Sequence, residues 1–448
     1  MIKQLFGKLA DILGVDITDA LHKKLVRGGG GVFVLKVGES FFALIFSILL
    51  ARILGPSEYG IFAYVMSIIG ILKVPSALGF PTLILREIAF YKTDSNWQKL
   101  KGILKCGNFY VSLSSIILII LSLLTAPYIL EETYLNVLYI ALPILIFSSL
   151  ITLNGNALRG YGKVVLGQIP GQLIRPVLFL LSLLLVYFTN YISLSPSLAM
   201  ILQLISYLIA MIMVFYFLKE ATPKIISEVA AKYDVKRWNK SLLPFLVISG
   251  TSVLKLNVDI LFLGFLSTSA DVGIYKIVVQ GANLIYFIMV AINIAVAPVI
   301  AEQYKSNEMR KLQNTLVMIS RVVTFLTIPL FLVLFFFGKG VLGLLFGAEY
   351  AAGAIALSIL CVSALFNAIT GPLPLILNMV ELEKECLRGE LVGVTINVLL
   401  NPIMIILLGI NGAALATAIS IVAGNLYWLY KLYSRTKLLP LAGLKIKK

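Results

Sequence analysis

Charged residues are scarce in this sequence, and histidine is almost absent. Only 13% of the 448 residues are charged and 60% are hydrophobic, whereas a soluble domain carries about a quarter charged residues. The single histidine, His22, excludes a histidine-based metal site or catalytic triad within the hydrophobic part of the chain. The three cysteines have no metal or redox spacing. We therefore expect an integral membrane protein with no metal and no cofactor.

Hydrophobic runs long enough to cross a bilayer recur along the chain. A membrane-spanning helix needs about 20 mainly apolar residues. We expect an all-α polytopic membrane protein, with twelve transmembrane helices in two six-helix lobes around a central cavity. The expected spans lie near residues 32–53, 58–80, 103–125, 135–157, 164–188, 196–218, 242–266, 272–299, 317–337, 353–379, 389–408 and 411–431.

The longest internal polar segment divides these spans six and six. It covers residues 219–241 and is expected to be a cytoplasmic linker between an N-lobe, 32–218, and a C-lobe, 242–431. Residues 1–31 are predicted to form a cytoplasmic amphipathic segment that ends in a glycine hinge. Residues 432–448 are predicted to form a basic cytoplasmic tail.

Basic residues set the predicted orientation. When Arg52, Lys105, Arg321 and Lys431, near the ends of their spans, are counted with the adjoining loops, thirty of the 37 Lys and Arg residues lie in the N-terminus, the even-numbered loops and the C-terminus, and two lie in the odd-numbered loops. Because basic loops stay in the cytoplasm, both termini are expected on the cytoplasmic side of the cell (inner) membrane. The net charge of +16 then follows from topology, and we expect no nucleic-acid partner.

A short motif is repeated where the second helix of each half begins. Residues 58–62 read Glu-Tyr-Gly-Ile-Phe, and residues 271–275 read Asp-Val-Gly-Ile-Tyr. In each copy an acid, one residue and then Gly-Ile with an aromatic residue open the helix. Parallel repeats of this kind are the usual plan of an alternating-access transporter.

Basic residues also lie inside the predicted spans. A charge in hydrocarbon costs several kcal/mol, so such residues usually face a water-filled cavity or a charged ligand. A surplus of basic over acidic residues in the spans predicts an anionic cargo. The candidate cargo-binding residues are Lys36, Lys73, Arg175, Lys255 and Lys276, and the candidate ion-coupling or charge-pairing residues are Glu39 and Asp259. Polar residues at helical spacing that we expect to line the same cavity are Gln168, Gln172, Gln280 and Asn283.

Several of these residues have a simpler explanation. Lys36 and Lys276 lie within two turns of their helix ends and could reach the membrane surface. Lys36 and Glu39, and likewise Lys255 and Asp259, share a helical face, where each acid partly neutralises its base. Apart from Glu58 at the first residue of its span, Lys73 has no acid within its span, and Arg175 has none, so these two are the better candidates for an anion.

An ordered set of short motifs runs from about residue 32 to 431. It begins with Leu-Ala-Arg-Ile-Leu-Gly-Pro-Ser-Glu-Tyr-Gly at 50–60 and Leu-Arg-Glu-Ile-Ala at 85–89. It continues with Asn-Val-Asp-Ile-Leu-Phe-Leu-Gly at 257–264 and ends with Gly-Ile-Asn-Gly-Ala-Ala-Leu-Ala-Thr-Ala at 409–418. This set resembles the Wzx-type polysaccharide flippases, which move lipid-linked oligosaccharides, of the multidrug/oligosaccharidyl-lipid/polysaccharide exporter superfamily.

The resemblance implies a non-enzymatic flippase of a polyprenyl-(pyro)phosphate-linked oligosaccharide, acting from the cytoplasmic to the outer leaflet. It implies that spans one, two, seven and eight border the cavity and its lateral opening. Arg52 and Glu58 match the family's turn after the first span and are candidate gate residues. The expected partners are the lipid bilayer, the lipid-linked glycan and enzymes of glycan assembly, and the protein is expected to be a monomer.

Three other functions remain open at this point. An ion-coupled multidrug or metabolite exporter of the same superfamily would favour acidic sites for cationic cargo, whereas this interior is net basic. The coupling ion, H⁺ or Na⁺, is undecided in either case. A polymerase or ligase of glycan assembly would need a sizeable external loop, and the largest here is near residues 338–352. The uneven placement of charges argues against a pore.

Overall fold

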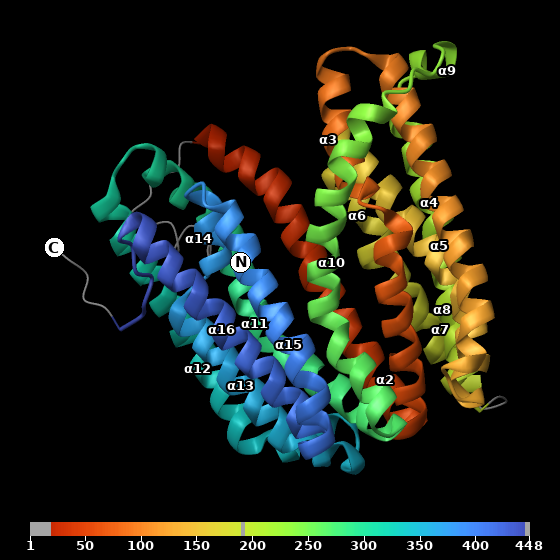
Figure 1. Ribbon diagram of the computed structural model, residues 1–448, viewed down its shortest axis with the longest axis vertical. Helices are drawn as coiled ribbons and strands as arrows, with labels where there is room; N and C mark the ends of the chain where they lie inside the picture. The colour runs from red at the N-terminus through yellow and green to blue at the C-terminus, as the bar shows by residue number, and fades with distance from the viewer. Residues whose placement is uncertain (1–18, 190–192, 444–448) are drawn as a thin grey trace. The chain divides into compact units, whose positions relative to one another are not determined.

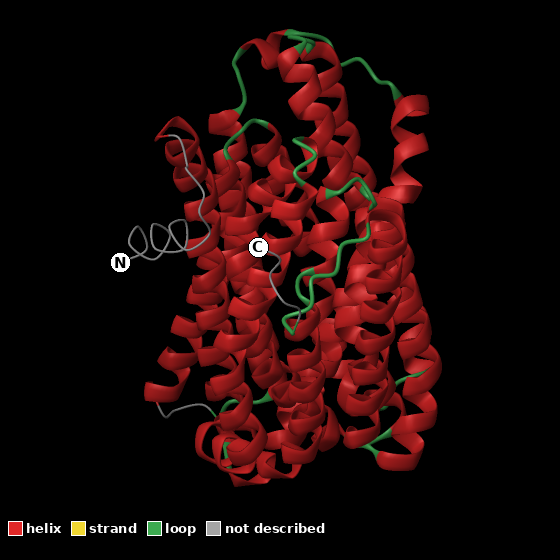
Figure 2. Cartoon of the chain, turned by 90° about the vertical axis from the view of Figure 1, so that its left-hand side faces the viewer, coloured by secondary structure: helices red, strands yellow, loops and turns green. Residues whose placement is uncertain are grey.

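The computed structural model of this chain describes residues 19–189 and 193–443. Every regular element in these ranges is helical (Figures 1 and 2). Most of the amphipathic segment that the sequence predicts lies before residue 19, outside the described residues. Helix α2 is helical through Gly28–Gly31, and the flexibility expected of this run stays a prediction.

Eleven helical segments in the described ranges are long and apolar enough to cross a membrane. The first of them, Leu35–Ala77, joins two helices at Gly55, whose φ of 71° breaks the helix before Pro56. The twelve expected spans are therefore accounted for, and the all-helical membrane fold is confirmed. The principal helices are α2 (Asp19–Ala77), α3 (Phe80–Thr93), α4 (Trp97–Thr125), α5 (Glu132–Gly160), α6 (Val164–Ile169), α7 (Arg175–Thr189), α8 (Pro196–Ala221), α9 (Ile225–Glu228), α10 (Val235–Leu266), α11 (Ser269–Lys305), α12 (Met309–Phe346), α13 (Ala354–Thr370), α14 (Leu373–Met379), α15 (Glu383–Leu408) and α16 (Ile410–Thr436).

The chain forms two compact units. Among the described residues, the first unit contains Gly30–Gly264 and Thr268–Gly273, and the second contains Phe265–Ser267 with residues 19–29 and 274–443. Helix α10 therefore packs with the first unit. The two predicted lobes, divided at residues 219–241, were defined by the repeat of six spans and not by packing. This division stays a prediction.

Each unit has its own hydrophobic core. In the first unit, α3 inserts Phe80, Ile84 and Ile88 among side chains of α4, α5 and α8. In the second, α12 contributes Leu312 and Leu316 to a cluster completed by α13, α14 and α16. These residues are almost wholly inaccessible. Because lipid removes the usual contrast between apolar side chains and water, close packing of this kind is what holds membrane helices together.

Helices α2 and α10 run side by side along the first unit, and glycines allow their close approach. In order along the two helices, Val74 contacts Gly250, Gly70 contacts Asn257, and Tyr64 contacts Gly264. A Cβ atom on any of these three glycines would touch the opposite helix, so the absence of a side chain permits each contact.

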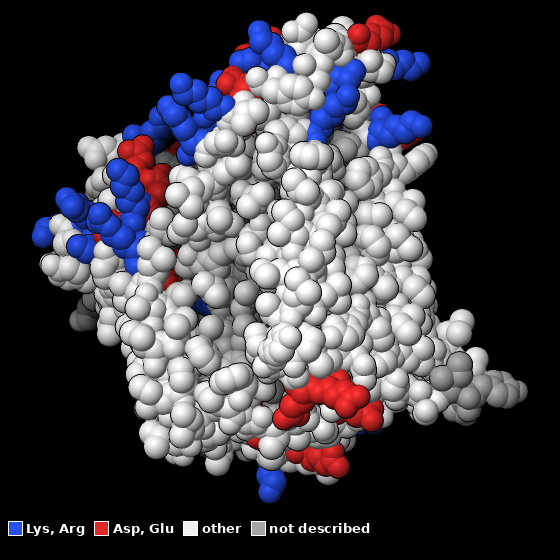
Figure 3. Space-filling view, turned by 45° about the vertical axis from the view of Figure 1, so that its right-hand side comes forward, with Lys and Arg blue, Asp and Glu red and all other residues white. Residues whose placement is uncertain are grey.

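Most charged side chains on the face shown in Figure 3 lie near the ends of the helices. Basic residues predominate at one end, where some acidic residues lie among them, acidic residues form a group near the other end, and the surface between is mostly uncharged. A band of this kind is the surface that a membrane-spanning bundle presents to lipid.

Candidate functional site: two cations in the first unit

Lys73 and Arg175 are brought together in the first unit. Lys73 lies in the second half of α2, and Arg175 is the first residue of α7. Both side chains are half-buried, and their charges repel each other. Within the described residues, the Lys73 ammonium group has neither an ion pair nor a hydrogen bond. An isolated charge in hydrocarbon is costly, so an anion or water beside these two cations would lower the free energy of the site.

A π-helical turn positions Arg175. The turn covers Pro170–Ile174, and the backbone N–H of Arg175 donates to the carbonyl of Pro170, five residues earlier. Pro176 follows directly and has no N–H to continue the normal α-helical pattern. Insertions of this kind redirect side chains and are frequent at functional sites.

The guanidinium group of Arg175 is held on one side only. Its Nε donates to the carbonyl of Gly171 over 3.1 Å, and the group lies over the ring of Tyr207 at 4.8 Å from the ring centroid. Neither terminal nitrogen has a hydrogen-bond partner among the described residues. The planar face is therefore fixed by Tyr207 while the two terminal nitrogens can donate to a ligand.

Gln172, in the same π-helical turn, adds an acceptor. Its Oε1 atom is buried and has no hydrogen-bond partner in the part of the chain that the structure describes. Gln168, one turn earlier, is half-buried. A buried carbonyl oxygen without a donor costs about 1–3 kcal/mol, which a hydroxyl group of a ligand would recover.

The charges of the first span pair as their spacing predicts. Lys36 Nζ lies 2.8 Å from Glu39 Oε2, and the two side chains are partly exposed. The neutralisation of Lys36 by Glu39 is confirmed, so Lys36 carries less uncompensated charge than Lys73. Its role in cargo binding stays a prediction.

The remaining predicted residues are spread over both units. On α10 of the first unit, Asp259 is buried and Lys255 is exposed, and both have interaction partners. On α11 of the second unit, Lys276 and Gln280 are half-buried and Asn283 is exposed. Whether these residues share a cavity with Lys73 and Arg175 stays a prediction. Among the described residues, no group of three His, Cys, Asp or Glu side chains is placed to hold a metal.

The turn after the first span contains the two candidate gate residues. Arg52 and Glu58 are both exposed, on either side of the break at Gly55. Ser57 Oγ lies 2.7 Å from Ser269 Oγ, at the start of α11. The two copies of the repeated motif therefore meet, a contact that sequence reasoning did not foresee.

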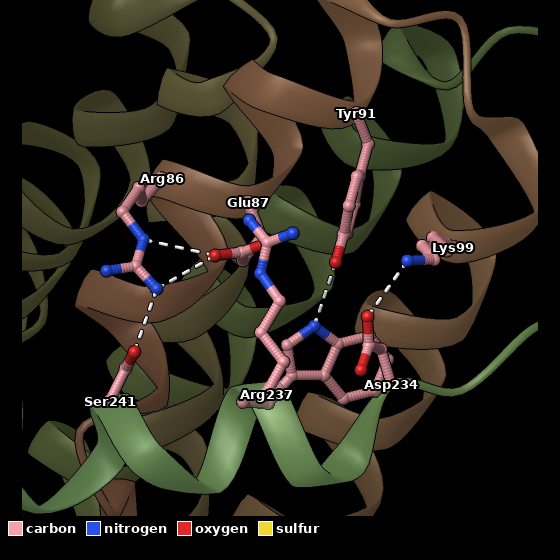
Figure 4. A network of polar contacts seen from close by, with 8 residues as sticks. Arg86, Glu87, Tyr91, Lys99, Asp234, Arg237 and Ser241 are labelled. Carbon is pink, nitrogen blue, oxygen red and sulfur yellow. Dashed lines mark hydrogen bonds and ion pairs between the residues drawn. The ribbon is translucent and has the colours of Figure 1, made fainter.

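A second polar cluster, which sequence reasoning missed, joins α3 to α10 (Figure 4). Glu87 is completely buried, and its carboxylate accepts hydrogen bonds from Arg86 at 3.1 and 2.8 Å. Arg237 of α10 forms an ion pair with the same carboxylate at 3.4 Å. Arg86 also donates to Ser241 and lies over the ring of Phe245. We call Arg86, Glu87 and Arg237 the α3–α10 clamp.

Two further contacts extend this cluster. Trp238 Nε1 donates to the hydroxyl of Tyr91 over 3.0 Å, and burial raises the pKa of Tyr91 to about 12. Lys99 of α4 donates to Asp234 over 2.8 Å, and this bond lowers the pKa of the Asp234 carboxyl. The only sign of this cluster in the sequence was the acid Glu87 in the run Leu-Arg-Glu-Ile-Ala, which follows a long apolar span.

Comparison with known proteins agrees with the fold. The model of a family described as polysaccharide biosynthesis protein matches residues 25–304, and the MatE model matches residues 244–403. A probable low-salt glycan biosynthesis flippase of Haloferax volcanii is 26% identical over 165 residues, which are 36% of this chain and 34% of that protein. A probable flippase of the same organism is 25% identical over 185 residues, 41% of this chain and 39% of that protein. The chain thus spans little more than a third of these two relatives.

Longer matches come from other proteins. An uncharacterized membrane protein of Methanocaldococcus jannaschii is 20% identical over 417 residues, 89% of this chain and 81% of that protein. A MATE family multidrug resistance transporter of the MOP superfamily, solved in an inward-facing conformation, superposes with a TM-score of 0.72 at 14% identity, over 89% of this chain and 95% of that one. The lipid II flippase MurJ, in an inward closed conformation, superposes with a TM-score of 0.70 at 19% identity, over 90% of this chain and 87% of that one.

The two solved structures show a common fold, and the first family model covers more than half of the sequence. The chain therefore belongs to the polysaccharide biosynthesis protein family, and it has the fold shared by the MATE transporter and the flippase MurJ.

Proposed function

We propose that the protein moves a polyprenyl-phosphate- or pyrophosphate-linked oligosaccharide from the cytoplasmic to the outer leaflet by alternating access. The observation that carries this proposal is the half-buried Lys73, which has no anionic partner among the described residues and lies beside the like-charged Arg175. An anionic head group supplies the missing charge. It is also the part of such a lipid that cannot cross hydrocarbon unaided.

Each side chain of this site suits one part of the cargo. Arg175 offers two terminal nitrogens in a planar fork, which matches two phosphate oxygens. Lys73 adds a compact second charge. Gln172 Oε1 accepts a hydrogen bond from a sugar hydroxyl, while the polyprenyl tail remains in the bilayer.

The orientation in the membrane belongs to the same proposal. The basic helix ends, including Arg86, Lys99 and Arg237, lie in the cytoplasm together with both termini. The acidic ends, including Glu58, lie outside. Enzymes that assemble the glycan on the cytoplasmic leaflet then deliver cargo at the basic side, and the protein works as a monomer.

Reconstitution tests the proposal. Purified protein is placed in vesicles with a fluorescent polyprenyl-pyrophosphate glycan, and a membrane-impermeant quencher reports the fraction of label in each leaflet. Protein-dependent exchange between leaflets is expected. Equal exchange in empty and protein-containing vesicles would contradict it. A neutral polyprenyl glycan without phosphate is the control, and it should exchange more slowly.

A second candidate, an ion-coupled multidrug or metabolite exporter, is favoured by one pair of observations. The MatE model matches residues 244–403, and within them Asp259 is buried on α10. A buried carboxylate can carry H⁺ or Na⁺ and can bind a cation. Gradient-driven accumulation of a cationic dye in the same vesicles, without movement of the glycan lipid, would favour this candidate over the flippase.

A further inference from the structure

The chain beyond α16 crosses the second unit instead of leaving it. Residues Lys437–Gly443, here called the C-terminal strap, form the trace that precedes the grey C-terminal residues in Figure 2. Leu438 is buried in the core of the second unit, and Pro440 is also buried. Burial of a segment without regular structure requires partners for its backbone groups.

The side-chain amide of Gln313, on α12, binds both the backbone N–H and the backbone carbonyl of one strap residue, Leu439. Its Nε2 donates to the carbonyl of Leu439 over 2.8 Å, and its Oε1 accepts from the N–H of Leu439 over 2.9 Å. This pairing imitates the two bonds between neighbouring β-strands. It recognises an extended chain and is indifferent to the side chain that the chain carries.

The strap also reaches the break between α13 and α14. The break lies at Gly371, where φ is 77°, inside a segment long and apolar enough to span a membrane. The N–H of Ala442 donates to the carbonyl of Ile369 over 3.2 Å. Ser320 Oγ donates to the carbonyl of Pro440 over 2.5 Å, and a side chain on Gly371 would collide with that hydroxyl.

These contacts supply what an interrupted membrane helix lacks. Carbonyl groups at the end of α13 have no partner within their helix, and irregular backbone at membrane depth is tolerated only where protein satisfies it. The strap brings backbone donors and acceptors to this place, and Arg321 Nε fixes its far end by donating to the carbonyl of Ala442 over 3.0 Å.

We infer that Gln313, Ser320, Arg321 and Ile369 form a docking site for an extended peptide, and that its occupant is the C-terminal strap of the same chain. The docked strap closes the α13–α14 break and holds α14 against α12. The inference does not depend on which cargo the protein carries.

Truncation and replacement of the strap test this inference. Protein lacking residues 438–448 should unfold at a lower temperature in detergent, and a synthetic peptide of those residues should restore the midpoint saturably. A scrambled peptide of the same composition should restore less, because Leu438 and Pro440 would no longer meet their pockets. An unchanged midpoint on truncation would overturn the inference.

The untruncated chain gives a second measurement in case the truncated protein fails to fold. Gln313→Ala should increase hydrogen exchange at Leu439 and at Gly371 and Leu373 together, whereas Gln98→Ala, at an exposed glutamine of the first unit, should change neither. Unchanged exchange at Leu439 in Gln313→Ala would overturn the docking site.

A crosslink identifies the occupant. Ile369→Cys combined with Ala442→Cys, at two residues joined by a backbone hydrogen bond, should form a disulfide within one chain, since the native Cys106, Cys361 and Cys386 are buried. A covalent dimer formed through the same pair would show that a second copy supplies the strap, which would overturn the assignment to the same chain.

Discussion

Gly60 of α2 and Gly273 of α11 contact each other through equivalent backbone atoms. A Cβ on Gly60 would lie 3.0 Å from the amide nitrogen of Gly273, and a Cβ on Gly273 would lie 3.0 Å from the amide nitrogen of Gly60. Each would also collide with the carbonyl oxygen four residues before the other glycine, that of Ser269 or Pro56. Because both glycines belong to the repeated motif, the repeat forms a nearly symmetric helix contact.

We expect Gly60→Ala and Gly273→Ala each to destabilise the protein by about 1–3 kcal/mol, the usual cost of overpacking. Alanine favours the helix itself, so any loss reports the contact between helices. Thermal unfolding in detergent measures the effect. Gly340→Ala, at a helical glycine with nothing within 4 Å, is the control and should be neutral or slightly stabilising. Wild-type midpoints for both motif variants would contradict the contact.

Removing the acid of the α3–α10 clamp should have a larger effect. Glu87→Ala leaves Arg86 and Arg237 without their buried partner, and we expect a loss of about 3 kcal/mol, the low end for a buried pair because both guanidinium groups reach solvent. Glu308→Ala breaks the exposed pair with Lys311 and should cost less than about 1 kcal/mol. Denaturant unfolding in mixed micelles measures the loss of unfolding free energy in each variant. Equal losses in Glu87→Ala and Glu308→Ala would contradict the stabilising role of the clamp.

The bond between Lys99 and Asp234 predicts a dependence on pH. A carboxyl group whose pKa is lowered by folding stabilises the fold above its unfolded pKa and loses this contribution as the pH falls through its folded pKa. Asp234→Asn should therefore destabilise the protein by up to about 1 kcal/mol at pH 7. The difference from wild type should shrink below the unperturbed pKa of 3.8. A difference that is constant from pH 3 to pH 7 would argue against the charged pair.

The membrane fold was readable from the sequence because hydrophobic run length and basic-loop bias are local signals. Span ends were less readable. Helix α12 covers Met309–Phe346, beyond the predicted 317–337, because a polar stretch before the apolar run and the mostly apolar residues 338–346 after it continue the helix. The pairing of Lys36 with Glu39 was also predictable, since three residues separate them on one helix.

Contacts between distant parts of the chain could not be predicted in this way. Glu87 and Arg237 belong to different helices, and no periodicity relates them. The π-helical turn before Arg175 depends on how Pro170 and Pro176 disturb one helix together. The C-terminal strap is held through its backbone, so its side chains carry little trace of the contact with Gln313.

Lys73 and Arg175 are the residues proposed to bind the anionic head of the cargo. Loss of one charge-assisted hydrogen bond costs about 1.5–3 kcal/mol, so transport should fall by about tenfold or more in Lys73→Ala and in Arg175→Ala. Arg175→Lys should be intermediate, because it keeps the charge and loses the planar fork. Lys339→Ala, at an exposed lysine of α12, is the matched control.

The most direct measurement is the initial rate of leaflet exchange of the labelled polyprenyl-pyrophosphate glycan in vesicles that contain equal amounts of each folded variant. Wild-type rates are expected for Lys339→Ala, and exchange at least about tenfold slower is expected for Lys73→Ala and Arg175→Ala. Wild-type rates in both cation variants would contradict the proposed role of these residues.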